Sequence, residues 1–163
     1  MEEFAFSIPQ NIKVGAGSLN KLPELAKELG KKKAFIISGP HLNKIGMVKK
    51  CQDALENAGI TSDCFTETEA NPSTETVEKA TEQYKSCGAD FIVAFGGGSP
   101  LDLAKVIGAR LVKNKQSVRQ MKGVLKIRKK LPLLIAIPTT SGTGSEVTIT
   151  AVITDQETHF KYP

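Results

Sequence analysis

A glycine turn between a buried strand and a helix constrains this chain more than any other feature of its sequence. The apolar run at residues 91–95 leads into three consecutive glycines, residues 96–98, and a helix is expected directly after them. Glycine permits backbone angles that other residues avoid, and it leaves no side chain to keep a ligand away from the backbone. We expect Ser99 to cap this helix and Pro100 to take its first position. The unpaired N–H groups and the dipole of such a helix N-terminus bind phosphate, so the turn predicts a diphosphate site.

A second polar loop follows another apolar run. Residues 133–137 resemble a buried strand, and the next eleven residues, 138–148 (PTTSGTGSEVT), include eight Thr, Ser or Gly. Neighbouring parallel strands in an open α/β sheet place such loops side by side at the carboxyl edge, where ligands bind. The dinucleotide fingerprint GxGxxG does not fit the first loop, which alone supports only a phosphate site. Together, the two loops predict a dinucleotide crevice.

Strands alternate with helices along most of the chain. The apolar runs predict strands at residues 34–37, 60–65, 91–95 and 133–137. Apolar residues at helical spacing predict helices at residues 19–29, about 40–58, 74–87 and 101–113. Apolar strands joined by helices indicate parallel βαβ units covered on both faces. We therefore expect an α/β fold of one domain, residues 1–163, with a Rossmann-like, open, mostly parallel sheet and helices on both faces.

The remaining segments are less regular. Residues 4–14 are expected to form one or two short strands, and residues 114–130 a basic connector. Residues 148–154 alternate Thr and apolar side chains in part, which is typical of a half-exposed strand. A turn at residues 155–157 is expected to return this strand as a hairpin through Phe160 and Tyr162.

Composition and cysteine usage indicate an ordinary soluble protein. The chain has 163 residues, of which 40% are hydrophobic and 24% charged, enough for one domain with a proper core. No apolar run approaches the ~20 residues that span a bilayer, and the acidic N-terminus lacks a signal core. The three cysteines are widely spaced and form no metal-binding pattern, which indicates free thiols. We expect a cytoplasmic protein without a membrane partner.

The positive charge is concentrated in one stretch. Between Asp102 and Glu146 there are ten Lys and Arg residues and no acidic residue. A basic cluster is compatible with nucleic-acid binding, but the cluster lacks aromatic residues on which bases stack. We expect no nucleic-acid partner, and we interpret the stretch as a solvated surface whose field favours an anionic cofactor.

The two motifs resemble those of the iron-dependent (group III) alcohol dehydrogenase family. GGGSPLDLAK at residues 96–105 precedes PTTSGTGSEVT, which is followed by AVITD at residues 151–155, and the likeness extends to the FSIP and NP segments near residues 6–9 and 71–72. The resemblance implies hydride transfer between NADP or NAD and a small alcohol or aldehyde. It also implies a homodimer formed through the N-terminal strand.

The family's metal belongs to a part that this sequence does not match. The resemblance implies Fe2+ held by one Asp and three His in a C-terminal helical domain, but His41 and His159 lie in no matching motif. We therefore expect this chain to be the cofactor-binding half alone, with no metal ligand and no catalytic residue. It should bind cofactor without turnover.

Several small polar residues are candidates for cofactor binding. Backbone N–H groups are expected to bind the diphosphate at Gly97, Gly98 and Ser99, although a plain turn and helix cap would use the same residues. Hydroxyls and N–H groups are expected to reach the diphosphate and nicotinamide ribose from Thr139, Thr140 and Thr143, although capping is the alternative. Thr148 and Thr150 would share one face of a strand, and the resemblance places that face toward the nicotinamide.

Three further assignments rest on the resemblance. It places Asn71 beside the adenine, Asp102 near the nicotinamide, and Lys161 at the cofactor ribose. Each has a structural alternative. Asn71 is alternatively a turn residue before a proline, and Lys161 a solvated lysine. Asp102, three residues after Ser99, is alternatively part of a capping box. The acidic residue Glu146 is interpreted as structural.

The loop after residues 34–37 departs from many NAD-using relatives. Those relatives have an Asp where Gly39 stands, and that Asp bonds the adenosine ribose hydroxyls. Glycine removes the charge that would repel a 2′-phosphate, and Ser38 and the Gly39 N–H are expected to donate to that phosphate. We therefore expect a preference for NADP.

Other functions remain open at the level of sequence. Glycerol dehydrogenases and dehydroquinate synthases have related architecture with zinc, but PTTSGTGSEVT matches the iron branch better. A freestanding nucleotide-binding or regulatory module is an alternative of a different class.

Overall fold

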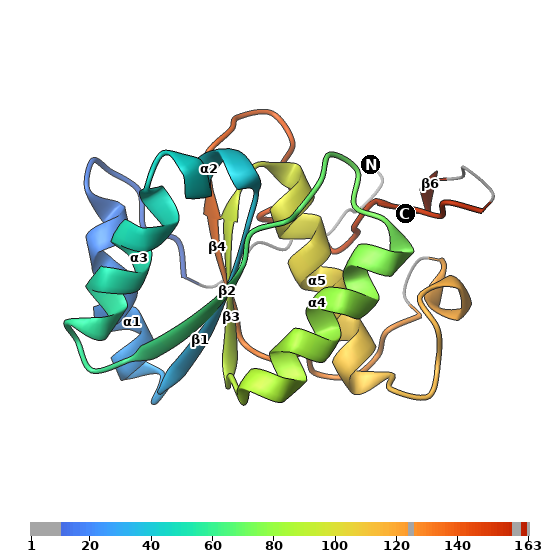
Figure 1. Cartoon of the computed structure of the whole chain (residues 1–163), viewed down its shortest axis with the longest axis horizontal. Helices are drawn as coiled ribbons and strands as arrows, with labels where there is room; N and C mark the ends of the chain where they lie inside the picture. Colours follow the sequence, from blue (N-terminus) through green and yellow to red (C-terminus); the bar gives the residue numbers. More distant parts are fainter. Residues whose placement is uncertain (1–10, 124–125, 158–160, 163) are drawn as a thin grey trace, which may run out of the picture.

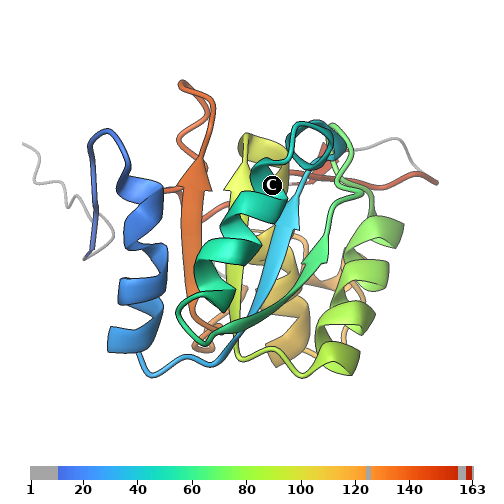
Figure 2. The ribbon, with the colours of Figure 1, turned by 60° about the vertical axis from the view of Figure 1, so that its left-hand side comes forward.

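Four parallel strands form the centre of the molecule (Figure 1). The computed structural model describes residues 11–123, 126–157 and 161–162. The strands are β1 (Lys33–Ser38), β2 (Thr61–Phe65), β3 (Phe91–Gly96) and β4 (Leu134–Pro138). They pair in the order β2-β1-β3-β4, and Figure 2 shows this order across the sheet. The predicted parallel sheet is confirmed.

Helices cover both faces of the sheet, as Figure 1 shows. One face carries α1 (Leu22–Glu28) and α3 (Met47–Glu56), and the other carries α4 (Thr74–Cys87) and α5 (Gly98–Val112). There are also two short 3-10 helices in the described residues. The first, η1 (Ser18–Lys21), precedes α1, and the second, η2 (Arg119–Met121), lies within the basic connector. Two layers of helices around a parallel sheet define the Rossmann-like α/β class.

Alternation along the strands builds two separate cores. In β1, Phe35 and Ile37 pack with α4 and α5, whereas Ala34 and Ile36 pack with α1 and α3. Phe35 meets the ring of Tyr84 edge-on, with centroids 5.6 Å apart. Successive side chains of a strand point to opposite faces, so an entirely apolar strand must be covered on both.

The helix predicted at residues 40–58 is wrong as one element. It is divided into α2 (Pro40–Lys44) and α3, with Gly46 between them at φ 79°. A positive φ cannot continue a right-handed helix, and glycine adopts it without strain. The predicted helix at residues 74–87 is confirmed as α4, whose cap Ser73 accepts from the Thr76 N–H at 3.1 Å.

The C-terminal strand is much shorter than predicted. Only β5 (Ile153–Thr154) is a strand, and it pairs antiparallel with β6 (Lys161–Tyr162), which confirms the hairpin. Residues 148–152 bond to α5 and do not join a neighbouring strand. Of the strand predicted at residues 4–14, residues 11–14 are not a strand, and the rest lies outside the described residues, as does Phe160.

None of the helices in the described residues combines the length and apolar character needed to cross a bilayer.

Candidate functional site

A cleft of about 490 Å³ lies where β1, β3 and β4 end. Its walls come from the loops after these strands and from the loop after β2. Six of the predicted cofactor-binding residues line it: Gly39, Gly97, Gly98, Ser99, Thr139 and Thr140. Because all four strands are parallel, their carboxyl ends meet at this one edge, which is the usual ligand-binding edge of an open α/β sheet.

The glycine turn between β3 and α5 depends on its first residue. Gly96 has φ 149°, and a Cβ atom there would lie 2.8 Å from Cγ of Pro100. Gly97 is the N-cap of α5, and the helix begins at Gly98. The predicted cap at Ser99 and first position at Pro100 are therefore wrong by two residues. The proline is still tolerated, because the first four N–H groups of a helix have no partner within it.

The two predicted loops are in contact. A Cβ atom on Gly97 would lie 3.2 Å from Oγ1 of Thr140, and one on Gly98 would lie 3.2 Å from Cγ2 of Thr143. The Thr139 N–H also donates to the Gly96 carbonyl at 2.9 Å. The expectation that neighbouring strands place these loops side by side is confirmed. The N-terminus of α5 packs against the threonine loop.

The loop after β1 has one residue that can face a ligand and one that cannot. The Ser38 hydroxyl is buried and donates to the Phe95 carbonyl at 2.8 Å. The expectation that Ser38 donates to a phosphate is therefore wrong, because a hydroxyl has one proton to give. Gly39 has φ −94°, and a Cβ atom there would meet only the Thr68 carbonyl, at 3.6 Å. A side chain would fit, so the absence of an acid at this position is not forced by the fold.

Asn71 connects the loop after β2 to the glycine turn. It adopts a left-handed backbone conformation with φ 54°, which asparagine tolerates better than most residues. Its N–H donates to Oγ of Ser99 at 3.4 Å. Asn71 thus borders the cleft without belonging to its walls.

Among the residues of the cleft wall that were not selected from the sequence are Thr68 and Glu69. Thr68 and Glu69 follow β2 at the carboxyl edge, and this position is the signal that could have identified them. Oε1 of Glu69 accepts from the Thr76 hydroxyl at 2.8 Å and from the Ser73 N–H at 3.0 Å. These bonds lower the pKa of Glu69 below its usual value. The carboxylate is thereby held at the N-terminus of α4.

Asp102 anchors the segment that follows the threonine loop. Its Oδ2 accepts from the Val152 N–H at 3.0 Å, and its Oδ1 lies 3.3 Å from Nζ of Lys105. The Lys105 ammonium also donates to the Thr148 hydroxyl at 3.0 Å and to the Thr150 carbonyl at 2.7 Å. Burial lowers the pKa of Lys105, and the charge of Asp102 opposes that effect. The expected capping box is wrong, because the carboxylate bonds forward to residue 152.

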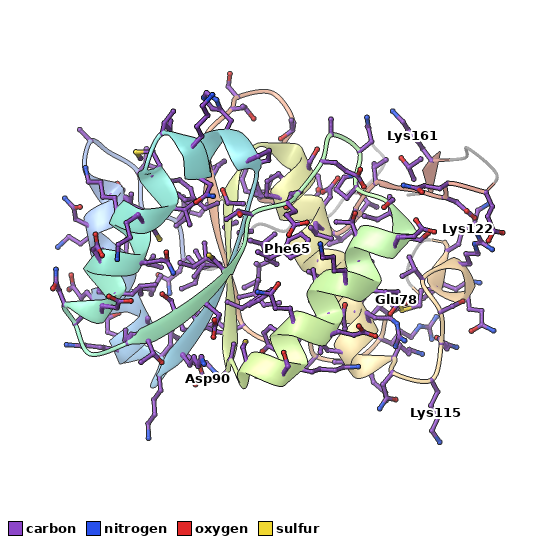
Figure 3. The ribbon with its side chains drawn as sticks, viewed as in Figure 1. Phe65, Glu78, Asp90, Lys115, Lys122 and Lys161 are labelled. Atoms are coloured by element: carbon purple, nitrogen blue, oxygen red, sulfur yellow. The ribbon has the colours of Figure 1, made fainter. Side chains whose placement is uncertain are left out.

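The remaining predicted residues lie outside the cleft. Thr148 and Thr150 line a second cavity of about 450 Å³, whose other walls are mostly apolar side chains of α5 and the connector. Thr143 packs against Gly98. Lys161 is exposed on β6, and Figure 3 places it on the C-terminal hairpin. The structure therefore brings together the diphosphate candidates but separates them from the residues assigned to the nicotinamide half.

The described residues do not fit an iron site. Among them, no three or more His, Cys, Asp or Glu side chains gather closely enough to hold a metal ion.

The fold and the cleft define a Rossmann-like α/β protein in which a glycine turn and a threonine loop meet at the carboxyl edge of the sheet. Residues 9–163 match the family model described as iron-containing alcohol dehydrogenase, and the chain belongs to that family.

Several relatives match this chain over nearly its whole length. The chain is 39% identical to a choline dehydrogenase of Bacillus subtilis over 99% of its length, and covers 41% of that protein. It is 38% identical to an NADPH-dependent butanol dehydrogenase of Clostridium saccharobutylicum, covering 97% of this chain and 40% of the relative. A sulfoacetaldehyde reductase of Bifidobacterium kashiwanohense, solved in complex with NAD+, superposes with a TM-score of 0.91 at 28% identity, over all of this chain and 43% of the other. The chain thus spans about 40% of the length of these two curated relatives.

Proposed function

We propose that this chain is the dinucleotide-binding part of an alcohol dehydrogenase that transfers hydride between a nicotinamide cofactor and a small alcohol or aldehyde. The observation that carries the proposal is the contact between the glycine turn and the threonine loop at the edge of the sheet. Family membership supports the reaction class. The cofactor supplies the hydride, and the role of this chain is to bind and orient the cofactor.

Both walls of the cleft offer hydrogen-bond donors to a diphosphate. The first N–H groups of α5 and the dipole of this 15-residue helix attract the diphosphate. The small side chains of Thr139 and Thr140 line the opposite wall and offer hydroxyls. A diphosphate between these walls would receive donors from both.

The isolated chain is proposed to bind cofactor without turnover, because its described residues contain no cluster that could hold the metal. The cytoplasm is the proposed compartment, and the support for it is that Cys51, Cys64 and Cys87 are all free thiols.

NADP(H) is the proposed cofactor. Gly39 places no carboxylate beside the adenosine ribose, and a relative with 38% identity is named as NADPH-dependent. One acid does line the cleft, but the carboxylate of Glu69 accepts hydrogen bonds at the N-terminus of α4, which partly offsets its charge. An acid at residue 39 would add a second carboxylate to the cleft wall.

The test is a calorimetric titration of the purified chain with NADPH and with NADH. Wild type should bind NADPH about tenfold more tightly, a difference of about 1.4 kcal/mol. Gly39→Asp should reverse this order, whereas Gly39→Ala controls for the added Cβ atom, which the site accommodates. Tighter binding of NADH by wild type would contradict the NADP(H) preference. Binding of neither nucleotide would contradict the proposed function itself.

A further inference from the structure

Thr68 carries a buried hydroxyl group that the fold leaves unused. The residue is 4% exposed and lines the cleft, yet its Oγ1 has no hydrogen-bond partner among the described residues. A buried hydroxyl without a partner has lost its hydrogen bonds to water and gained none in return, which destabilises the fold. Such groups are rare in folded proteins and require an explanation.

The location of Thr68 distinguishes it from the other unpartnered oxygens. Two more buried side-chain oxygens in the described residues lack partners, on Glu146 and Thr154, and neither residue lines this cleft. The Thr68 N–H donates to the Ser38 carbonyl at 3.4 Å, and the Thr68 carbonyl lies 3.6 Å from the position of a Cβ atom on Gly39. Thr68 is therefore fixed through its backbone against the loop that is proposed to face the adenosine ribose.

The side chain can present its hydroxyl to a ligand without moving the backbone. Threonine occupies staggered rotamers, and one step about the Cα–Cβ bond brings Oγ1 to a position held by the methyl group or the hydrogen. A phosphate oxygen in the cleft would offer this buried hydroxyl a charged acceptor. Hydrogen bonds to charged groups are stronger than those between neutral groups.

We propose that Thr68 donates its hydroxyl to the 2′-phosphate of an adenine dinucleotide and is a determinant of the NADP(H) preference. This inference rests on the proposed function. Gly39 only avoids repelling the 2′-phosphate, whereas Thr68 would attract it. The hydroxyl replaces the buried Ser38 as the donor on this side of the cleft.

The test uses substitutions that change the hydroxyl and little else. Thr68→Val replaces Oγ1 by a methyl group of similar size, and Thr68→Ser retains the hydroxyl. Thr154→Val is the matched control, because it removes another buried, unpartnered hydroxyl outside the cleft. The probes are NADPH, NADH and adenosine 2′,5′-bisphosphate, titrated by calorimetry, with thermal unfolding of each unliganded variant as a check of folding.

Thr68→Val should weaken NADPH and adenosine 2′,5′-bisphosphate about tenfold and NADH less than about twofold. Thr68→Ser and Thr154→Val should bind like wild type, and both valine variants should unfold at or above the wild-type temperature. NADPH binding by Thr68→Val within twofold of wild type would overturn the inference. Equal losses for NADPH and NADH would also overturn it, because the contact would then not be to the 2′-phosphate. If wild type binds no nucleotide, the proposed function fails first, so the two failures are distinguishable.

Discussion

Gly97 and Gly98 are needed because a side chain would crowd the neighbouring loop, and not because of their backbone angles. Neither is among the residues with positive φ, whereas Gly96 is. At Gly98 a Cβ atom would lie 3.2 Å from Cγ2 of Thr143 and 3.3 Å from Oγ of Ser145. These glycines therefore let α5 begin in close contact with the threonine loop.

Gly98→Ala should displace the threonine loop by a few tenths of an ångström. We expect NADPH affinity to fall about tenfold and the free energy of unfolding to fall by about 1 kcal/mol, as for mild overpacking. Gly39→Ala is the control, because its Cβ atom has ordinary contacts only. Calorimetric titration and chemical denaturation measure the two effects. Unchanged affinity in Gly98→Ala would show that the close approach of the loops does not matter for binding.

Single hydroxyls were the least predictable part of the site. The sequence identified the polar loops correctly, but it assigned Ser38 to a ligand and Ser99 to a helix cap. Ser38 instead bonds Phe95 on the neighbouring strand, and Ser99 accepts from Asn71 in another loop. These partners are distant in sequence, so local patterns carry no information about them.

One turn of α5 holds the segment after the threonine loop. Asp102 and Lys105 lie on the same side of the helix, and their side chains are 12% and 14% exposed. Together they form hydrogen bonds with every second residue of this segment: Thr148, Thr150 and Val152. The course of this segment thus depends on one ion pair and not on a sheet ladder.

Asp102→Ala should release that segment. It leaves the Lys105 ammonium without its charge partner and the Val152 N–H without an acceptor, and breaking a buried pair costs about 3 kcal/mol. Asp102→Asn retains an acceptor and should cost less. Chemical denaturation measures the loss, and thermolysin digestion should cut Asp102→Ala faster within residues 146–152. Equal stability of both variants and wild type would contradict the assigned role of the carboxylate.

Elements with a strong apolar pattern were predicted well. The four strands of the sheet and helix α4 were located almost to the residue because their apolar spacing and terminal residues agree with the tertiary structure. The strand predicted at residues 148–154 and the single helix at residues 40–58 were wrong. In the first case Lys105 of α5 forms hydrogen bonds with the Thr148 hydroxyl and the Thr150 carbonyl. In the second case Gly46 adopts a positive φ that apolar spacing does not reveal.

At the scale of the whole molecule, the two edges of the sheet differ from its centre. The interior strand β3 is buried throughout, whereas β4 is only half-buried although its residues are as apolar. Within the described residues, β4 lies at one edge of this sheet with β3 as its strand neighbour, as Figure 2 shows. An edge strand has backbone groups that pair with no other strand, so β4 is the less protected of the two.

Amide hydrogen exchange should reveal this difference. We expect amides of β3 to exchange at least about tenfold more slowly than those of β4, since local opening requires less free energy at a half-buried edge. Mass spectrometry of peptides covering each strand, at two protein concentrations, measures the rates. Equal protection that appears only at the higher concentration would show that a second copy covers β4, and equal protection at both would contradict the expected weakness of the edge.

The strand order also places the two proposed parts of the cofactor site on different pairs of loops. The loops after β3 and β4 form the wall proposed for the diphosphate, while residues 39 and 68 belong to the loops after β1 and β2. Substitutions that alter discrimination between cofactors can therefore accumulate in one pair of loops while the other pair stays intact. A lineage with this arrangement can exchange one redox pool for another through a few substitutions in these two loops, and a protein engineer can follow the same route.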